Sequence, residues 1–267
     1  MISYLRTYER LGLKAIPMKA DTGPIGGDYS HEFLVLANTG ESQVFYDKEI
    51  SNLSLGEQKI DYENYSNLEN IVHKFTTPYA RTDETHDKDL FEKIPEARRV
   101  EGRGIEVGQI FYFGTKYSES MGAKIDLANG KRIPIEMGSH GIGVSRLVGA
   151  LIEANHDEQG IIWPASVSPF DAVIINLKQN DQLCNEISIK IYNMLKANGF
   201  DILYDDRLDS VGAKFSSMDL IGIPKQIIVG PRGVSEGLLE IKFRNNGQRI
   251  NIPLSNNLIE LINELKK

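Results

Sequence analysis

The alternation of apolar and polar positions is most regular after residue 170 of the chain. There, short apolar runs typical of buried strands alternate with longer segments whose apolar residues recur every three or four positions, as in amphipathic helices. The expected elements are strands at 172–177, 200–204 and 227–229, helices at 182–198 and 213–221, a hairpin formed by 238–243 and 248–252, and a last helix at 257–265. This order predicts an α/β domain with a mostly parallel sheet and right-handed crossovers.

The first 165 residues show a different pattern. Short extended runs at 14–20, 32–36, 104–113, 124–127 and 132–137 are joined by turns rather than by regular helices. Such runs favour an α+β domain, in which helices pack on an antiparallel sheet. Residues 41–103 are polar and weakly periodic, and the pattern predicts no structure for them.

Two prolines mark the boundary between these regions. Pro164 and Pro169 enclose a short segment that suits a stiff linker. We therefore expect two domains, one of residues 1–165 and one of residues 166–267.

The composition is that of an ordinary globular protein. The 267 residues are 41% hydrophobic and 25% charged. No run approaches the roughly 20 apolar residues of a membrane span, so no association with a membrane is expected. The single cysteine, Cys184, excludes an internal disulfide and a cysteine-rich metal site, which suits a reducing cytoplasm.

The net charge of −7 is unevenly distributed along the chain. Residues 166–267 hold 12 basic and 12 acidic residues, which leaves 18 basic against 25 acidic for residues 1–165. Within 225–249 five basic residues stand against two acidic ones. The second domain can therefore present a basic face to a nucleic acid, although a solvated surface explains the charges equally well.

The first candidate for chemistry is a glycine-rich run, 138–146, expected to be a turn between a strand at 132–137 and a helix at 147–152. Glycines there let the backbone approach a ligand closely. The run matches neither the P-loop nor the dinucleotide-binding pattern, and a tight structural turn is the simpler explanation for it. Arg146 changes that balance, because a guanidinium near a helix N-terminus suits the bidentate binding of phosphate oxygens.

The second candidate is the loop 21–33, which is expected to deliver Ser30, His31, Glu32 and Phe33 onto a strand. No second histidine follows at zinc-binding spacing, and no nucleophile elbow occurs in the chain. A lone histidine is more often structural. The neighbouring glycines favour a pocket wall here.

The third candidate is the segment 104–118, which contains Glu106 and Gln109. The two side chains would face opposite sides of a regular strand, but Gly108 permits a bulge that brings both to one face. Glu106 could then bind Mg²⁺. The alternative is an exposed strand carboxylate without a function.

Taken together, these clusters resemble prolyl-tRNA synthetase of the bacterial type, a class II aminoacyl-tRNA synthetase. The resemblance covers nearly the whole chain and rests on the stretches 12–17, 30–33, 104–108, 117–118, 138–146, 160–164, 205–207, 212–215 and 219–224. It implies that residues 1–165 are the C-terminal part of a class II catalytic domain, with motif 3 at 138–146. It also implies that residues 166–267 form the anticodon-binding domain.

The resemblance implies an activity and a role for each candidate residue. The family uses ATP to convert proline to prolyl-adenylate and then transfers the prolyl group to tRNA-Pro. Arg146 would be the catalytic arginine of motif 3. The residues implied are Glu106, Gln109, Gly141, Gly143 and Arg146 for ATP, Glu106 for Mg²⁺, His31, Phe33 and Ser139 for proline, and Arg207, Lys214 and Phe215 for the anticodon. His140 departs from the family, which often has Tyr there.

The sequence also differs from the family in two respects. Motif 1, which forms the homodimer interface of the full-length enzyme, and motif 2, which binds the α-phosphate, are not found. Only some 60 residues separate Glu41 from Arg103, so the large editing insertion is also not expected. Two rival interpretations remain: a non-catalytic synthetase-like protein that binds tRNA or regulates, and an unrelated nucleotide-binding protein.

Without motifs 1 and 2, the 267-residue chain alone is expected not to form prolyl-adenylate. The measurement is proline-dependent exchange between ATP and pyrophosphate by the purified chain. Exchange above the rate without proline would contradict this expectation.

Overall fold

The computed structural model describes residues 1–23, 29–57, 59–254 and 258–266. They form two compact units, Met1–Ala154 and Asn155–Lys267, each described here by itself. The expected loop at 24–28 lies outside the described residues. In the part of the chain that is described, no helix is both long and apolar enough to cross a membrane.

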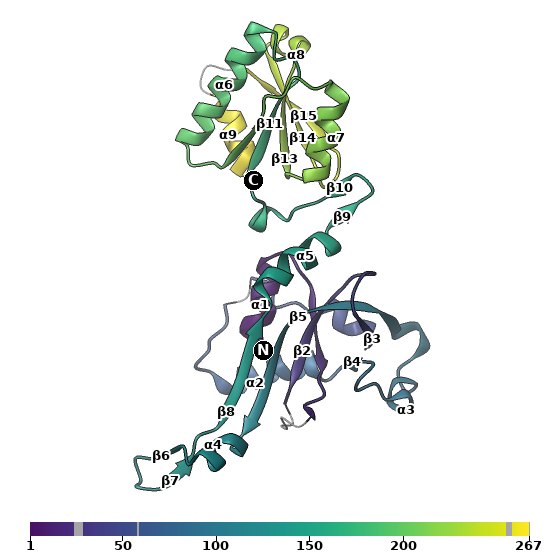
Figure 1. Ribbon diagram of the computed structural model, residues 1–267, viewed down its shortest axis with the longest axis vertical. Coiled ribbons are helices and arrows are strands. Elements are labelled where there is room, and N and C mark those ends of the chain that lie inside the picture. The colour runs from purple at the N-terminus through teal and green to yellow at the C-terminus, as the bar shows by residue number, and fades with distance from the viewer. Residues whose placement is uncertain (24–28, 58, 255–257, 267) are drawn as a thin grey trace. The chain divides into compact units, whose positions relative to one another are not determined.

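The first unit contains most of the irregular structure (Figure 1). Its elements are α1 (Ile2–Arg10), β1 (Ala15–Lys19), β2 (His31–Leu36), β3 (Ser42–Asp47), α2 (Tyr65–Thr76), β4 (Ala80–Thr82), α3 (Lys88–Phe91), β5 (Arg99–Gly114), α4 (Lys116–Met121), β6 (Lys124–Asp126), β7 (Arg132–Pro134), β8 (Met137–Ile142) and α5 (Val144–Ala154). The region 41–103, for which the sequence predicted no structure, thus supplies β3, α2, β4 and α3 and the first residues of β5. These elements pair with or cover the predicted strands.

The six-stranded sheet of this unit is almost entirely antiparallel and partly closes on itself. The strand order is β2-β1-β4-β3-β5-β8, and β2 also pairs with β5, so five of the strands form a ring. Only β1 and β4 run parallel. Inside the ring lies an apolar cluster: Ile16, Met18, Leu34, Val44, Tyr46, Ile50 and Ala80. The helix α1 covers the outside of β2, where Tyr4 and Tyr8 pack against Phe33.

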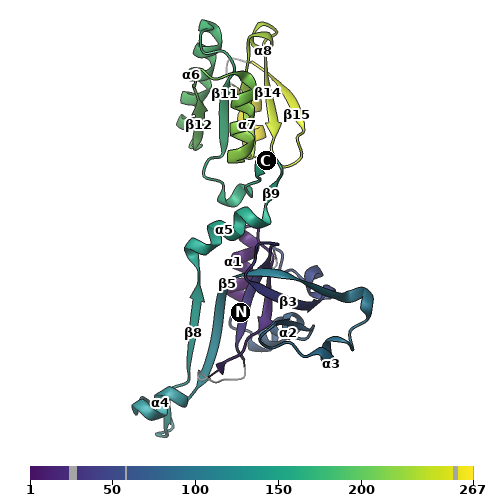
Figure 2. The ribbon, with the colours of Figure 1, turned by 45° about the vertical axis from the view of Figure 1, so that its right-hand side comes forward.

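Strand β5 holds the sheet together, because it pairs with three other strands along its length. Residues 99–104 pair with β3, 104–110 with β2 and 108–114 with β8. Figure 2 shows β5 and β8 side by side, with α4 beyond their ends. The alternation of side chains along β5 therefore determines on which face of the sheet each of its residues lies.

The glycine-rich run is not the turn that the sequence predicted. Met137–Ile142 is strand β8, and α5 begins two residues later at Val144. The glycines serve close approach between strands: a Cβ at Gly108 would lie 2.7 Å from the carbonyl oxygen of Gly141, and one at Gly138 would lie 2.8 Å from that of Phe111. Glycine pattern alone does not distinguish a turn from such a strand pair.

The second unit follows the predicted order closely. Its elements are β9 (His156–Asp157), β10 (Gly160–Ile161), β11 (Ala172–Asn176), α6 (Gln182–Ala197), β12 (Ile202–Asp205), α7 (Val211–Ile221), β13 (Lys225–Val229), α8 (Pro231–Ser235), β14 (Leu238–Phe243), β15 (Arg249–Pro253) and α9 (Ile259–Lys266). The sheet order is β12-β11-β13-β14-β15. The first three strands are parallel, but β14 and β15 are antiparallel, so the sheet is mixed rather than mostly parallel. In Figure 1, α6 and α9 cover one face of this sheet and α7 covers the other.

The division between the compact units follows Ala154, eleven residues before the predicted boundary after residue 165. It lies there because the hairpin β9–β10 is hydrogen-bonded to the second unit. Arg244, 4% exposed, donates to both carboxylate oxygens of Asp157 (2.8 and 2.6 Å) and to the carbonyl of Gly160 (3.1 Å). Trp163 Nε1 donates to the carbonyl of Ile221 at 2.8 Å. The prolines of the predicted linker lie within the second unit.

We expect Arg244→Met to lower the free energy of unfolding of the second unit, because it removes the buried guanidinium that pairs with Asp157. The bond to Arg244 lowers the pKa of Asp157, so this stabilisation is present above the unfolded-state pKa and is lost as the pH falls below it. The measurement is urea unfolding near pH 7 and near pH 3. Arg232→Met, whose side chain is 91% exposed, is the control and should change little. Equal effects of the two variants would contradict the assigned role of Arg244.

Candidate functional site

Arg146 lies in the first turn of α5, beside β5. Its Nη1 donates to the carbonyl oxygen of Glu106 at 3.1 Å and lies 3.9 Å from the Glu106 carboxylate. The same nitrogen lies 3.3 Å from the Glu41 carboxylate. The Gly143 amide donates to the carbonyl of Val107 at 3.0 Å, which fixes the start of α5 against β5. The structure thus brings together Arg146 and Glu106, two residues 40 positions apart.

The bulge that the sequence suggested near Gly108 is present in β5. Phe33 of β2 pairs with Gly108, and Leu34 pairs with Glu106, so Val107 is the extra residue. Because one residue is skipped, Glu106 and Gln109 lie on the same face of the sheet. On this face Gln109 pairs with Gly141, and Ser139 lies one step further along, opposite Phe111.

The three predicted proline-binding residues do not lie together. His31 and Phe33 alternate with Glu32 along β2, so they face the opposite side of the sheet from Glu106, Gln109 and Ser139. Phe33 is fully buried beneath α1. Burial lowers the pKa of His31, whose Nδ1 is buried without a partner among the described residues. The residue of this segment that shares a face with Glu106 is Glu32.

The face that carries Glu106 is acidic. Burial, and after it the neighbouring carboxylates Glu106, Glu84 and Asp21, together raise the pKa of Glu32 to about 7. Burial also raises the pKa of Glu106, while Arg146 opposes the shift. No three carboxylate or histidine side chains among the described residues converge as metal ligands. Glu106 can still bind Mg²⁺ in the usual protein manner, through one carboxylate together with phosphate oxygens.

The predicted anticodon residues have three different environments. Lys214 is 1% exposed, with its Nζ 2.5 Å from the carbonyl of Asn176 and 4.0 Å from the buried carboxylate of Asp205. This burial corrects the expectation that Lys214 contacts the anticodon. Arg207 is partly exposed and binds Asp205 through Nε and Nη2, both at 2.9 Å. The residue pair Lys214 and Arg207 therefore neutralises Asp205 from two sides.

Phe215 lies at an open pocket of the second unit. The Arg249 guanidinium lies 5.6 Å from the centre of the Phe215 ring, and Arg249 also pairs with Glu240 at 2.6 Å. The pocket, of about 440 Å³, is lined by Phe215, Arg232, Arg249 and Asn251 over an apolar floor that includes Leu239. The sequence did not single out Arg249 or Arg232 individually, although both belong to the basic run 225–249.

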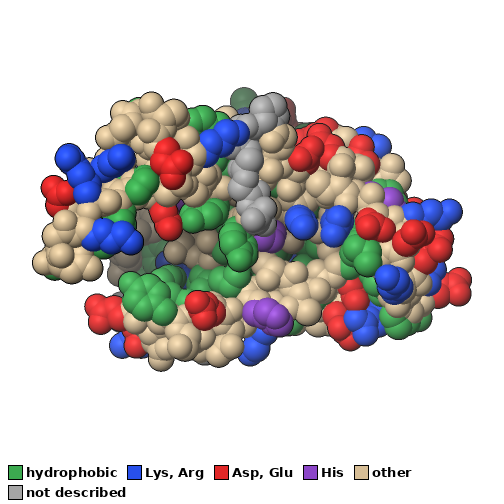
Figure 3. Space-filling model, turned by 90° about the horizontal axis from the view of Figure 1, so that it is seen from below, with side chains coloured by type: hydrophobic (Ala, Val, Ile, Leu, Met, Phe, Trp, Pro, Cys, Tyr) green, Lys and Arg blue, Asp and Glu red, His purple; other side chains and the backbone are tan. Residues whose placement is uncertain are grey.

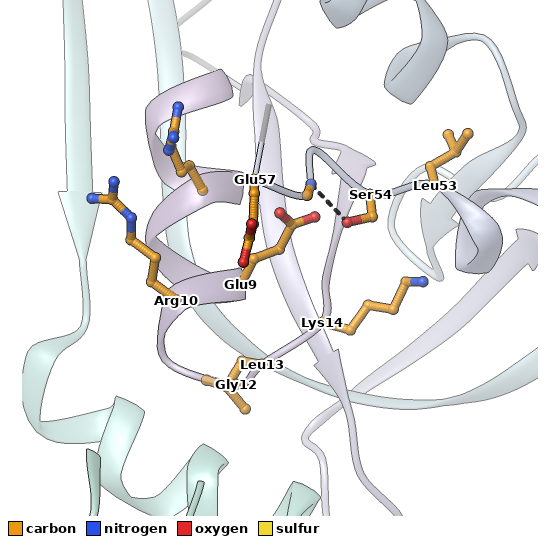
Figure 4. Close-up of a pocket in the computed structure, with 10 residues that line it drawn as sticks. Glu9, Arg10, Gly12, Leu13, Lys14, Leu53, Ser54 and Glu57 are labelled. Atoms are coloured by element: carbon orange, nitrogen blue, oxygen red, sulfur yellow. Dashed lines mark hydrogen bonds between the residues drawn. The ribbon is translucent and has the colours of Figure 1, made fainter. Parts of the chain in front are cut away.

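Another cavity, of about 690 Å³, lies away from Arg146, between the end of α1 and residues 53–57. Figure 4 shows Glu9 and Glu57 close together there, with Arg10 extending away from them. Glu9 accepts from the Leu55 amide at 2.9 Å, so it braces this loop. Figure 3 shows acidic and basic side chains interspersed on the face that it presents, without a large patch of one sign.

In the second unit, residues 171–265 match the family described as "Anticodon binding domain". Over 248 residues, 93% of its length, the chain is 58% identical to "Proline--tRNA ligase" of Ruegeria sp. (strain TM1040), and over 250 residues it is 59% identical to the same-named protein of Paracoccus denitrificans. The predicted resemblance to prolyl-tRNA synthetase, a class II enzyme, is thereby confirmed. The chain spans about 55% of the length of these relatives.

Solved structures agree with this fold. The chain matches the "Crystal Structure of Prolyl-tRNA Synthetase from Cryptosporidium parvum complexed with L-Proline and AMP" with a TM-score of 0.67 and 18% identity. The match covers 99% of this chain and 45% of that one. At this identity the likeness concerns the fold alone.

Glu32 supplies a test of the site's electrostatics. Its folded-state pKa of about 7 lies above the ordinary value of 4.5, so its contribution to stability is present below pH 4.5 and is lost as the pH rises through 7. Glu32→Gln should therefore be more stable than the wild type at pH 8 by about 1–2 kcal/mol, once partial solvent exposure is allowed for. The two should be equally stable near pH 4.5.

The measurement is urea unfolding across this pH range. Glu101→Gln, which removes an exposed carboxylate of the neighbouring strand β5, is the control. A constant difference between wild type and Glu32→Gln at all pH values would contradict the raised pKa.

Proposed function

We propose that the chain is part of an ATP-dependent proline–tRNA ligase, in which the first unit binds ATP and proline and the second binds tRNA-Pro. The observation that carries this proposal is the identity of 58–60% to proline–tRNA ligases, which extends over 93% of the chain and so through both units. An intact enzyme of this kind would act in the cytoplasm and would form a homodimer.

Arg146 is suited to bind the phosphates of ATP. Its side chain is 53% exposed, and Nη1 lies 3.3 and 3.9 Å from two carboxylates, distances that are long for charge-assisted hydrogen bonds. Phosphate oxygens can therefore replace the carboxylates around it without loss of a strong ion pair. In adenylate formation the proline carboxylate attacks the α-phosphate and pyrophosphate departs, and Arg146 would neutralise charge on the departing group.

Glu106 would hold Mg²⁺ on the same face, and the ion would supply further neutralisation of the phosphate charge. Gln109 lies beside it across the bulge. Gly141 and Gly143 lie beside these two groups: a Cβ at Gly141 would lie 3.8 Å from the Gln109 side chain, and one at Gly143 would lie 3.2 Å from the Cβ of Arg146. The three predicted proline-binding residues are divided: Ser139 shares this face, whereas His31 and Phe33 lie behind the sheet.

In the second unit, the pocket at Phe215 suits a nucleobase. An aromatic ring beneath a guanidinium offers stacking, and Arg232 is 91% exposed for contact with a phosphate. The Nη1 of Arg207 lies 3.1 Å from the Asp209 carboxylate, and Arg207 would contact tRNA by exchanging this partner for a phosphate. Lys214 would act through Asp205 from within the core. These assignments rest on the exposure of each side chain and on the ion pairs that it makes.

Phe215→Ala should weaken binding of a tRNA-Pro anticodon stem–loop by about tenfold or more, because stacking contributes about 1–3 kcal/mol per base. Arg249→Gln should weaken it without removing a core side chain. The measurement is fluorescence anisotropy at fixed salt, with a stem–loop of altered anticodon for comparison. Tyr65→Ala, which removes an exposed aromatic ring of the first unit, is the control. Equal binding of both stem–loops by the wild type would contradict the proposed function.

A further inference from the structure

The turn between β2 and β3, residues 37–41, contacts α5, the helix that carries Arg146. Near the end of α5, the Thr39 hydroxyl donates to the Glu153 carboxylate at 2.7 Å. Near its start, the Glu41 carboxylate accepts from Nη1 of Arg146 at 3.3 Å. This turn therefore reaches both ends of the helix and places a carboxylate beside the guanidinium assigned to the phosphates.

The backbone of this turn is held firmly against β5. The Ala37 amide donates to the carbonyl of Arg103 at 3.1 Å, and the Arg103 guanidinium donates to the carbonyls of Gly40 at 2.6 Å and Glu41 at 3.1 Å. Gly40 is buried, and a Cβ there would collide with the backbone of Gly104. The position of Glu41 is therefore set by β5 and does not depend on its contact with α5.

The pair of Glu41 and Arg146 is exposed and long. The two side chains are 54% and 53% exposed, and ion pairs of this kind contribute little to stability. Among the residues that the structure describes, Arg146 is the one cation paired with the Glu41 carboxylate. The effect of Glu41 thus falls on the charge around Arg146 rather than on the fold.

Glu41 and Glu106 lie on the same nitrogen of Arg146, at 3.3 and 3.9 Å. Burial raises the pKa of Glu106, Arg146 lowers it, and the charge of Glu41 raises it again, so the two carboxylates also act on each other. A phosphate at Nη1 would lie beside both of them. The Glu106 charge would be neutralised by the Mg²⁺ proposed for it, whereas Glu41 would keep its charge once phosphate has taken its partner.

We infer that Glu41 is the exchangeable counterion of Arg146: it orients the guanidinium before nucleotide binds, is displaced by phosphate oxygens, and then weakens the binding of free pyrophosphate. This inference rests on the proposed function and adds a positioning residue to the same site. Because its turn is fixed on β5, Glu41 stays near the bound phosphates after it has lost Arg146. Its repulsion then favours the departure of pyrophosphate once the adenylate has formed.

The test is binding of inorganic pyrophosphate with Mg²⁺ to the 267-residue chain, measured by isothermal titration calorimetry. Glu41→Gln should tighten binding by about two- to fivefold, the range expected from exposed ion pairs. The difference should shrink as salt is added, because the charges are exposed. Glu101→Gln, which removes another exposed carboxylate of the first unit, is the control for net charge and should bind as the wild type does.

The NMR signal of the Arg146 side-chain Nε–H separates this role from a structural one. Pyrophosphate should shift it in the wild type, and Glu41→Gln should shift it without any ligand, while the melting temperature stays unchanged. Equal pyrophosphate affinity of wild type and Glu41→Gln would overturn the inference and leave the proposed function standing, and so would an Arg146 signal that does not respond to Glu41→Gln. A wild-type chain that binds neither pyrophosphate nor ATP would overturn both.

Discussion

The pairing of β5 with three different strands is the constraint on which the first unit depends. Its first residues close the ring through β3, its middle pairs with β2, and its last residues hold β8. The extra residue Val107 shifts the alternation of side chains within the strand. Without that shift, Gln109 would face α1 and Glu106 would be separated from it by the sheet.

The same bulge decides how Arg146 reaches the site. The carbonyl of Val107 accepts the Gly143 amide, and the carbonyl of Glu106 accepts the guanidinium of Arg146. The Val107 carbonyl also accepts the Tyr8 hydroxyl at 3.3 Å, so the extra residue of the bulge is bonded both to α1 and to the start of α5. The bulge at Val107 therefore lies where β5 holds the start of α5 and where Glu106 and Gln109 come to one face, the two features that the proposed nucleotide site requires.

Much of the second unit could be predicted from the sequence, because each strand and helix there has its own period and its own turn residues. The prediction of a mostly parallel sheet was wrong because the predicted hairpin, β14 and β15, joins the sheet through antiparallel pairing with β13. Lys214 was misplaced because a sequence shows a charge but not its burial. Asp205, whose carboxylate is fully buried, requires that cation beside it.

In the first unit, the sequence identified the candidate residues but did not show on which side of the sheet each of them lies. His31 and Phe33 stand beside Glu32 in the sequence, and only the register with β5 shows which of them faces Glu106. The region 41–103 is polar because its elements β3, α2, β4 and α3 each bury only a few residues. Its role in closing the ring follows from long-range pairing, which local pattern does not record.

The central claim is that the face of β5 carrying Glu106, together with the start of α5, binds the nucleotide. Amide chemical-shift mapping of the 267-residue chain during titration with ATP and Mg²⁺ tests it most directly. The account predicts that the largest changes occur at Glu106–Gln109 and Gly143–Arg146, with little change at Tyr4 and Tyr8 behind the sheet. Changes confined to α1 and the cavity beside residues 53–57 would contradict it.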